Sequence, residues 1–191
     1  VMEKNQDRRI RKTKLALKNG LLELMSQKNL KEISIRELTE KVDLNRGTFY
    51  LHYNDIFDLL EEIEEEAFTE FRKIVSSYPT GSLNGNPFPL LKDIFTFLKE
   101  NATLITVMLG STGDPAFVNR LKKLIWESCF EHWQFPLNKN KTKELQYFYN
   151  YTLGGCIGII ETWLQNDLKD TPEELAGLAK NIIINGVAVL K

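Results

Sequence analysis

Residues 45–53 of this 191-residue chain combine polar, basic and aromatic side chains with little aliphatic bulk. Arg46 carries a guanidinium group, Thr48 and Tyr50 carry hydroxyl groups, and Gly47 has no side chain at all. Donors of these types bind phosphate oxygens and the edges of bases, and a glycine lets another molecule approach the backbone closely. We therefore interpret the stretch as a surface for nucleic acid. A short helix with ordinary polar surface residues is the alternative.

Two short amphipathic helices joined by a tight turn would position these side chains. The first begins with Ser34 as N-cap and Glu37 three residues later, the pattern of a capping box in which each side chain bonds to the other's backbone N–H. The turn over residues 43–45 ends on Asn45, a residue type that caps the following helix well. Together the two helices form a helix-turn-helix, whose second helix enters the major groove of DNA.

The sequence RGTFYLHYNDIFDLL, residues 46–60, resembles the signature of the TetR family of one-component regulators, which places Gly-Thr, then Tyr-x-His-aromatic, before a Leu-rich helix. The similarity covers about a quarter of the chain, and the remainder resembles the family mainly in its helical pattern. At the start of the fourth helix the family usually has a Lys that contacts the DNA backbone. Here Ile56 stands at that position, so the contact is in question.

The resemblance implies roles for individual side chains. Phosphate or base-edge contacts would come from the second helix, through Arg46, Thr48, Tyr50 and His52. Ser34 would contact a phosphate at the head of the first helix. The complete set of predicted DNA-binding residues is Ser34, Asn45, Arg46, Gly47, Thr48, Tyr50, His52 and Tyr53.

The charges of the chain are divided unevenly although its net charge is only −1. Residues 1–53 hold 12 Lys and Arg against 7 Asp and Glu, whereas residues 54–191 hold 13 against 19. The first helix, expected from about Asp7 to Lys28, has cations in its first turns, where the helix dipole disfavours them. These cations are Arg8, Arg9, Arg11, Lys12 and Lys14. A solvated charged face is the ordinary explanation, but cations at this end favour an anionic partner, for which phosphate is the natural candidate.

The helical period continues to the end of the chain, and no segment shows the alternation of a strand. Helices are expected over about 54–77, 88–100, 102–109, 114–134, 142–167 and 171–190. The predicted fold is all-α with about nine helices: a three-helix bundle containing the helix-turn-helix, followed by a helical ligand-binding and dimerisation domain. We place a DNA-binding domain at 1–53 and an effector-binding and dimerisation domain at 54–191.

The helix expected over 142–167 has more apolar surface than one face can bury. Its glycines would let another helix come close, and the last helix offers a second surplus apolar surface. We predict a four-helix homodimer interface, with packing inside one subunit as the alternative. The predicted interface residues are Gly154, Gly155, Gly158, Ile159, Trp163, Ile182 and Ile183. A dimer would suit a palindromic double-stranded operator, whose half-sites lie roughly 34–36 Å apart.

Aromatic residues of the C-terminal domain could line an effector cavity, although most are expected to be ordinary core. The candidates are Phe95, Trp126, Phe130, Trp133, Tyr147 and Tyr151. The leading hypothesis is a repressor that a small-molecule effector releases from its operator. Residues 158–175 also resemble a TetR subgroup related to dihydroxyacetone kinase regulators, which implies an alternative. In that alternative the C-terminal domain senses a partner protein, and the regulator can be an activator.

Other classes of protein find little support in the sequence. The glutamates at 61, 62, 64, 65 and 66 have no nucleophile or His placed with them, so we interpret them as a solvated face and not as catalytic groups. Cys129 and His132 are three residues apart, but two Cys and two His in all are too few for a closed metal site. No cofactor is expected. With no run of some 18 apolar residues and no signal-peptide pattern, we expect the cytoplasm and no membrane partner.

Overall fold

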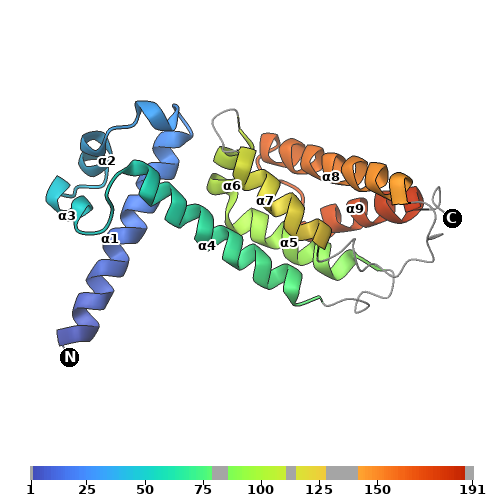
Figure 1. Cartoon of the computed structure of the whole chain (residues 1–191), viewed down its shortest axis with the longest axis horizontal. Coiled ribbons are helices and arrows are strands. Elements are labelled where there is room, and N and C mark those ends of the chain that lie inside the picture. The colour runs from blue at the N-terminus through green and yellow to red at the C-terminus, as the bar shows by residue number, and fades with distance from the viewer. Residues whose placement is uncertain (1, 79–85, 111–114, 128–141, 188–191) are drawn as a thin grey trace. The chain divides into compact units, whose positions relative to one another are not determined.

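The structure is a computed structural model that describes residues 2–78, 86–110, 115–127 and 142–187 (Figure 1). All regular elements in these ranges are helical: nine α-helices and one short 3-10 helix. The contacts divide the chain into two compact units, Val1–Ala67 with Thr106–Asp114, and Phe68–Ile105 with Pro115–Lys191. The all-α expectation is therefore confirmed. The functional boundary between residues 53 and 54 stays a prediction.

The first unit is built on four helices. They are α1 (Met2–Met25), α2 (Ile35–Lys41), α3 (Arg46–Tyr50) and the first part of α4 (Ile56–Ser76), with the 3-10 helix Leu30–Glu32 between α1 and α2. Each helix buries an apolar stripe against the others. The fully or nearly fully buried side chains include Leu17, Leu21, Met25, Leu38, Phe49, Leu59 and Ile63. Because one face of each helix is used in this way, the opposite faces carry the charged residues.

Helices α1 and α2 cross at very short range, and Gly20 makes the approach possible. A Cβ atom at position 20 would lie 2.4 Å from Cγ1 of Val42 and 3.1 Å from Cδ1 of Leu38. Real side-chain contacts do not reach the first of these distances. The short backbone separation between the two helices therefore depends on glycine at this position.

Helix caps set where several elements begin. Oγ of Ser34 accepts a hydrogen bond from the backbone N–H of Glu37 at 3.2 Å, but the Glu37 carboxylate binds Lys28 Nζ at 2.5 Å. Only half of the predicted capping box is therefore present at α2. At α9 a complete capping box is present: Thr171 Oγ1 accepts from Glu174 N at 3.2 Å, and the Glu174 carboxylate accepts from Thr171 N at 2.8 Å.

The second unit contains α5 (Phe88–Glu100), α7 (Pro115–Ile125), α8 (Thr142–Gln165), α9 (Pro172–Val187) and the last part of α4, while α6 (Ala102–Leu109) contributes to both units. Helices α5 and α9 pack against each other most extensively, and α9 also contacts α8 (Figure 1). The rings of Phe95 and Trp163 meet edge to face, 5.8 Å apart. The expected continuation of α7 to Gln134 lies partly outside the described residues.

Within the described ranges, no helix combines the length and the apolar character that a membrane crossing requires.

Replacement of Gly20 by Ala tests the close crossing of α1 and α2. The added methyl group collides with Val42, so we expect a loss of about 1–2 kcal/mol of unfolding free energy, since overpacking outweighs the helix propensity gained. Urea denaturation measures the loss. The double variant Gly20→Ala/Val42→Ala should recover part of it, and a Gly20→Ala variant as stable as the parent would contradict the packing described here.

Candidate nucleic-acid interface

Helix α3 has only five residues, and contacts to the rest of the first unit hold it in place. Phe49 on its inner side is fully buried, and its ring lies 5.7 Å from the rings of both Tyr50 and Tyr53. Oδ1 of Asn45 accepts a hydrogen bond from Gly47 N at 2.8 Å, so the predicted N-cap is confirmed. The helix is thus fixed at its start by a cap and along its inner side by an aromatic core.

The turn before α3 is also well defined. Asp43 adopts a left-handed backbone conformation with φ 53°, which Asp tolerates better than most residues. Leu44 N donates a hydrogen bond to Thr39 O at 2.9 Å and closes the turn. This turn sets the direction in which α3 leaves α2.

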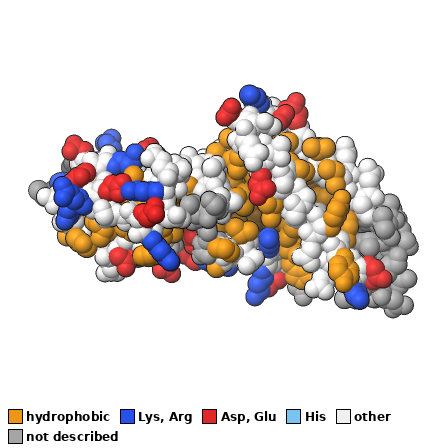
Figure 2. Space-filling view, turned by 90° about the horizontal axis from the view of Figure 1, so that it is seen from above, with side chains coloured by type: hydrophobic (Ala, Val, Ile, Leu, Met, Phe, Trp, Pro, Cys, Tyr) orange, Lys and Arg blue, Asp and Glu red, His pale blue; other side chains and the backbone are white. Residues whose placement is uncertain are grey.

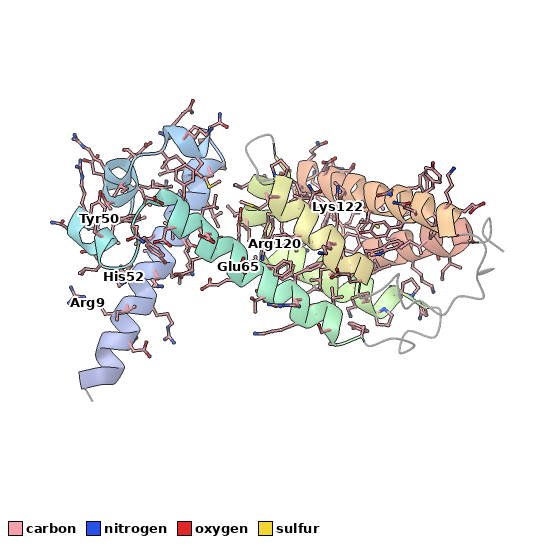
Figure 3. All side chains as sticks on the ribbon, viewed as in Figure 1. Arg9, Tyr50, His52, Glu65, Arg120 and Lys122 are labelled. Carbon is pink, nitrogen blue, oxygen red and sulfur yellow. The ribbon has the colours of Figure 1, made fainter. Side chains whose placement is uncertain are left out.

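The outer side of α3 carries the predicted contact residues. Arg46 and Gly47 are exposed, Tyr50 is 59% exposed, and Thr48 and His52 are half-buried. Figure 3 labels Tyr50 and His52 on this part of the unit. The set also includes two exposed cap residues, Ser34 at the start of α2 and Asn45 at the start of α3. Six side chains and the backbone at Gly47 are therefore at least partly exposed to solvent.

Tyr53 does not belong with them, which corrects the sequence prediction. Its side chain is only 3% exposed, and its hydroxyl donates a hydrogen bond to Glu62 Oε1 at 3.1 Å. Tyr53 lies after the end of α3 at Tyr50, and its side chain is directed into the core. The ring of Tyr53 instead supports α3 from the inside.

Position 56 differs from the family pattern in the way the sequence indicated. Ile56 is 5% exposed and packs in the core of the first unit. A buried aliphatic side chain cannot make the phosphate contact that the family's Lys makes at the head of this helix. That contact is therefore absent at this position.

Gly47 is not required by the fold itself. A Cβ atom built at this position would meet only Oδ1 of Asn45, at 3.4 Å, which is an ordinary contact distance. The chain could therefore accept a larger residue here.

The basic residues of the first unit fall into two groups. Lys14, Lys18, Lys28, Arg36 and Lys41 each have a nitrogen within 2.7 Å of a carboxylate oxygen. The second group is exposed and forms no ion pair with any described residue; it comprises Arg8, Arg9, Arg11, Lys12, Lys31 and Arg46. Figure 3 labels Arg9 on the N-terminal part of α1. The positive charge that remains for a polyanion therefore comes mainly from the first turns of α1 and the start of α3.

The carboxylate of Glu62 contacts three hydrogen-bond donors. The sequence did not indicate this role, because Glu62 lies within a run of glutamates. Lys14 Nζ and Lys18 Nζ each lie 2.7 Å from one of its oxygens, in addition to the Tyr53 hydroxyl. Burial raises the pKa of Glu62, but the hydrogen bonds and charges of the two lysines outweigh burial and lower the pKa from 4.5 to about 2. Burial, with the charge of Glu62, raises the pKa of Tyr53 above its usual value.

The four predicted effector residues that the structure describes lie in different surroundings. Phe95 is buried against Trp163, while Trp126 packs on Tyr149, with ring centroids 4.7 Å apart. Tyr147 and Tyr151 are 67% and 73% exposed, so the prediction that they line a cavity is corrected: they lie on the outer face of α8. The remaining two candidates, Phe130 and Trp133, lie outside the described residues, as do Cys129 and His132.

The predicted dimer residues separate into surface and core. Gly154 and Gly155 are exposed, Gly158 and Ile159 are half-buried, and Ile182 is 45% exposed. Trp163 and Ile183 are 1% and 5% exposed and belong to the subunit core, which corrects their assignment. The indole N–H of Trp163 donates to Asp170 O at 3.0 Å, so this side chain is satisfied within its own chain.

No cluster of three or more metal-ligating side chains occurs in the described parts of the chain.

A capped and anchored short helix after a tight turn, with its polar outer side exposed, defines a helix-turn-helix regulator. Residues 85–185, more than half of the chain, match a TetR family model described as "Transcriptional regulator C-terminal region". The chain therefore belongs to the TetR family of transcriptional regulators. The matched model describes a region of transcriptional regulators.

A curated relative and solved structures agree with this assignment. The chain is 24% identical over 165 residues to the "Uncharacterized HTH-type transcriptional regulator YxbF" of Bacillus subtilis (strain 168), covering 84% of this chain and 42% of that protein, so it spans about two-fifths of its relative. The fold is similar to a TetR transcriptional regulator from Streptococcus agalactiae 2603V, with TM-score 0.63, 22% identity, and coverage of 95% and 98% of the two chains.

The predicted subgroup receives weaker support. The "Dihydroxyacetone kinase operon activator DhaS" has a similar fold, with TM-score 0.56 and 14% identity, covering 94% of this chain and 98% of that one. At this identity the likeness shows the fold alone.

A pH series tests the environment of Glu62. Because the pKa of Glu62 is lower in the folded chain than its usual 4.5, its contribution to stability is complete above about pH 4.5 and is lost as the pH falls toward about 2. The difference in unfolding free energy between the parent and Glu62→Gln should shrink over this range. Urea denaturation at stepped pH measures it. Glu61→Gln, at an exposed neighbour, should show no such trend, and a constant difference for Glu62→Gln would contradict the description.

Proposed function

We propose that the chain binds a palindromic DNA operator as a homodimer, with the α3 helix of each subunit reading one half-site in the major groove. The observation that carries this proposal is the outer side of α3. It exposes Arg46, Gly47 and Tyr50 on a helix whose inner side is locked by Phe49. Side chains that touch base edges specify sequence only when their backbone is held in one place, and this helix meets that condition.

Each exposed group has a role in this proposal. The Arg46 guanidinium and the Tyr50 hydroxyl bind bases or phosphates, and the half-buried Thr48 and His52 add shorter-range contacts. Gly47 admits the DNA backbone, because nothing in the chain itself demands a glycine there. Ser34 and Asn45 complete the surface from the two helix starts. The unpaired cations of α1 supply the charge that makes such binding salt-dependent.

The homodimer is proposed from the outer face of α8. Tyr147, Tyr151, Gly154, Gly155 and Gly158 recur at helical spacing on that face, and a Cβ atom at any of the three glycines would meet nothing within 4 Å. Figure 2 shows hydrophobic side chains reaching the surface of the second unit. Glycines with open space above them let a second helix approach closely, and the flanking tyrosines would add apolar area.

On α9, exposed Leu178 and Ile182 would extend this surface. They are four residues apart and so lie on one side of the helix. Two such helices from each subunit would give a four-helix interface. Its symmetry would match a two-fold operator.

In the leading form of the proposal the chain is a repressor. A small-molecule effector binds the dimer shape in which the two α3 helices are wrongly spaced for DNA and thereby lowers operator affinity by about 1–3 kcal/mol. Helix α4 would carry this coupling, because its residues up to 67 belong to the first unit and those from 68 to the second. A bound operator would weaken effector binding by the same factor.

A second candidate function is that the second unit answers to a partner protein in place of a small ligand, and that the regulator is an activator. It rests on the resemblance of residues 158–175 to the subgroup related to dihydroxyacetone kinase regulators. Co-purification of a stoichiometric protein partner with the full chain would favour this second form. Release of the operator by a small molecule alone would favour the first.

Substitutions on α3 test the proposed reading surface. Arg46→Ala and Tyr50→Ala should each weaken operator binding by about 1–3 kcal/mol, since each removes a contact that the fold does not need. Gel-shift titrations measure the affinity, and sedimentation checks that the dimer persists. The control variant Lys123→Ala removes one positive charge from α7, far from α3 in the sequence. It should bind the operator with the parent's affinity. Operator affinity unchanged in both α3 variants would remove these residues from the surface.

A lysine on α8 tests the proposed dimer. Gly155→Lys places a charge in space that is open within the subunit, so the chain should still fold while the dimer weakens by at least about tenfold, as expected for an unpaired charge in an apolar interface. Analytical ultracentrifugation measures the association. Asn119→Lys, at an exposed position on α7, is the control. A Gly155→Lys protein that remains as dimeric as the parent would place the interface elsewhere.

A further inference from the structure

We propose that Glu62 is a positioning residue for the DNA-reading surface: from α4 it ties two lysines of α1 and the hydroxyl of Tyr53 together and so fixes where α3 stands. This inference rests on the proposed function and deepens it. In this proposal Glu62 does not touch DNA, but the discrimination between DNA sequences depends on it. We call the side chains of Lys14, Lys18, Tyr53 and Glu62 the carboxylate clamp.

The clamp joins three separate segments of the first unit at one carboxylate. Oε2 of Glu62 lies 2.7 Å from Lys14 Nζ, and Oε1 lies 2.7 Å from Lys18 Nζ and 3.1 Å from the Tyr53 hydroxyl. Lys14 Nζ also lies 5.2 Å from the centre of the Tyr53 ring, within the range of a cation–π contact. Lys14, Tyr53 and Glu62 are each held by at least two other members, whereas Lys18 is held within the clamp by Glu62 alone. Tyr53 therefore cannot move without disturbing its contacts to α1 and α4.

Tyr53 transmits this restraint to α3 and to its exposed side chains. Its ring lies 5.7 Å from Phe49, the anchor of α3, and 6.4 Å from the ring of His52. Its backbone N–H donates to Phe49 O at 3.0 Å. A five-residue helix makes too few hydrogen bonds of its own to keep its direction, so the position of Tyr53 decides where its outer side chains lie.

The clamp is a set of charge-assisted hydrogen bonds that are partly shielded from water. The side chain of Lys18 is 13% exposed and that of Glu62 is 29% exposed. Water therefore cannot take the place of either partner in these contacts without a loss of free energy. If the carboxylate is removed, Lys18 keeps only its contact to Glu66, at 2.6 Å. Lys14 and the Tyr53 hydroxyl then lose the acceptor they share, and the restraint on Tyr53 is lost with it.

The position of the clamp on α4 gives it a second consequence. Helix α4 continues from Ile56 to Ser76, and its residues from 68 onward belong to the second unit. A shift of α4 along its axis would move Glu62 away from Lys14 and Lys18. The clamp is thus one route by which a movement of this helix would reach Tyr53 and α3.

The neighbouring Glu61 provides a matched control. It lies on the same helix, is exposed, and forms no ion pair or hydrogen bond with any described residue. Glu61→Gln and Glu62→Gln raise the net charge by the same amount. Any difference between the two variants therefore reports the clamp and not the overall attraction of the chain to DNA.

The experiment compares the parent 191-residue chain with its Glu61→Gln, Glu62→Gln and Tyr53→Phe variants on two probes. One is a duplex that the parent selects from random sequences, and the other is a scrambled duplex of the same length; fluorescence anisotropy gives both affinities at one salt concentration. The ratio of the two affinities should fall roughly tenfold in Glu62→Gln, the size of one misplaced base contact, and should change less than about twofold in Glu61→Gln. Tyr53→Phe should lower the ratio in the same direction.

A general loss of stability would weaken binding to both probes equally and leave the ratio unchanged, which distinguishes positioning from a merely structural role. A folded Glu62→Gln protein with the parent's ratio overturns the proposal. If that variant does not fold, Tyr53→Phe, which removes a single hydroxyl, decides: an unchanged ratio again overturns it. A parent protein that selects no sequence overturns the proposed function itself, which is a separate outcome.

Discussion

A helix of five residues cannot maintain its own direction in water, and the first unit is arranged around this constraint. Isolated helices of this length are unstable because the first turn costs more entropy than its few hydrogen bonds return. Helix α3 is therefore fixed from outside itself. Asn45 caps its start, Phe49 is fully buried beneath it, and Tyr53 supports its end from the core. The side chains on its outer side are therefore available to contact a partner.

The cations of the first unit are divided in the same way, between those that are paired near the core and those that are exposed. Cations close to the core are neutralised by carboxylates of the same unit, as Lys14 and Lys18 are by Glu62. Cations on the early turns of α1 and at the start of α3 have no such partners among the described residues. A net charge of −1 for the whole chain thus hides an uncompensated positive surface, and counterion release depends on that surface and not on the net value.

Features that depend on local sequence were predictable. The N-cap at Asn45, the complete capping box at Thr171 and Glu174, and the helical period all act within a few residues, so the all-α fold could be predicted from the sequence. The Gly-Thr and Tyr-x-His pattern indicated the family for the same reason. The departure at Ile56 was also visible before its burial was known.

Features that depend on contacts between distant segments were not predictable. Lys14 and Glu62 are 48 residues apart, and nothing local distinguishes Glu62 from the exposed glutamates beside it. Tyr50 and Tyr53 look alike in sequence, yet one is exposed and the other buried, because the helix ends between them. Trp163 was predicted at a subunit interface but is buried against Phe95 of its own chain. The sequence around Gly20 did not indicate that a second helix crosses α1 at this residue.

The account is tested most directly by selecting bound sequences from a pool of random duplexes with the purified chain. An anchored reading helix carried twice by a symmetric dimer predicts an enriched inverted repeat, with half-site centres separated by about 10 base pairs or a multiple of that spacing. Enrichment of a single unrepeated site would contradict the dimer. No enrichment at low ionic strength would contradict the reading surface itself.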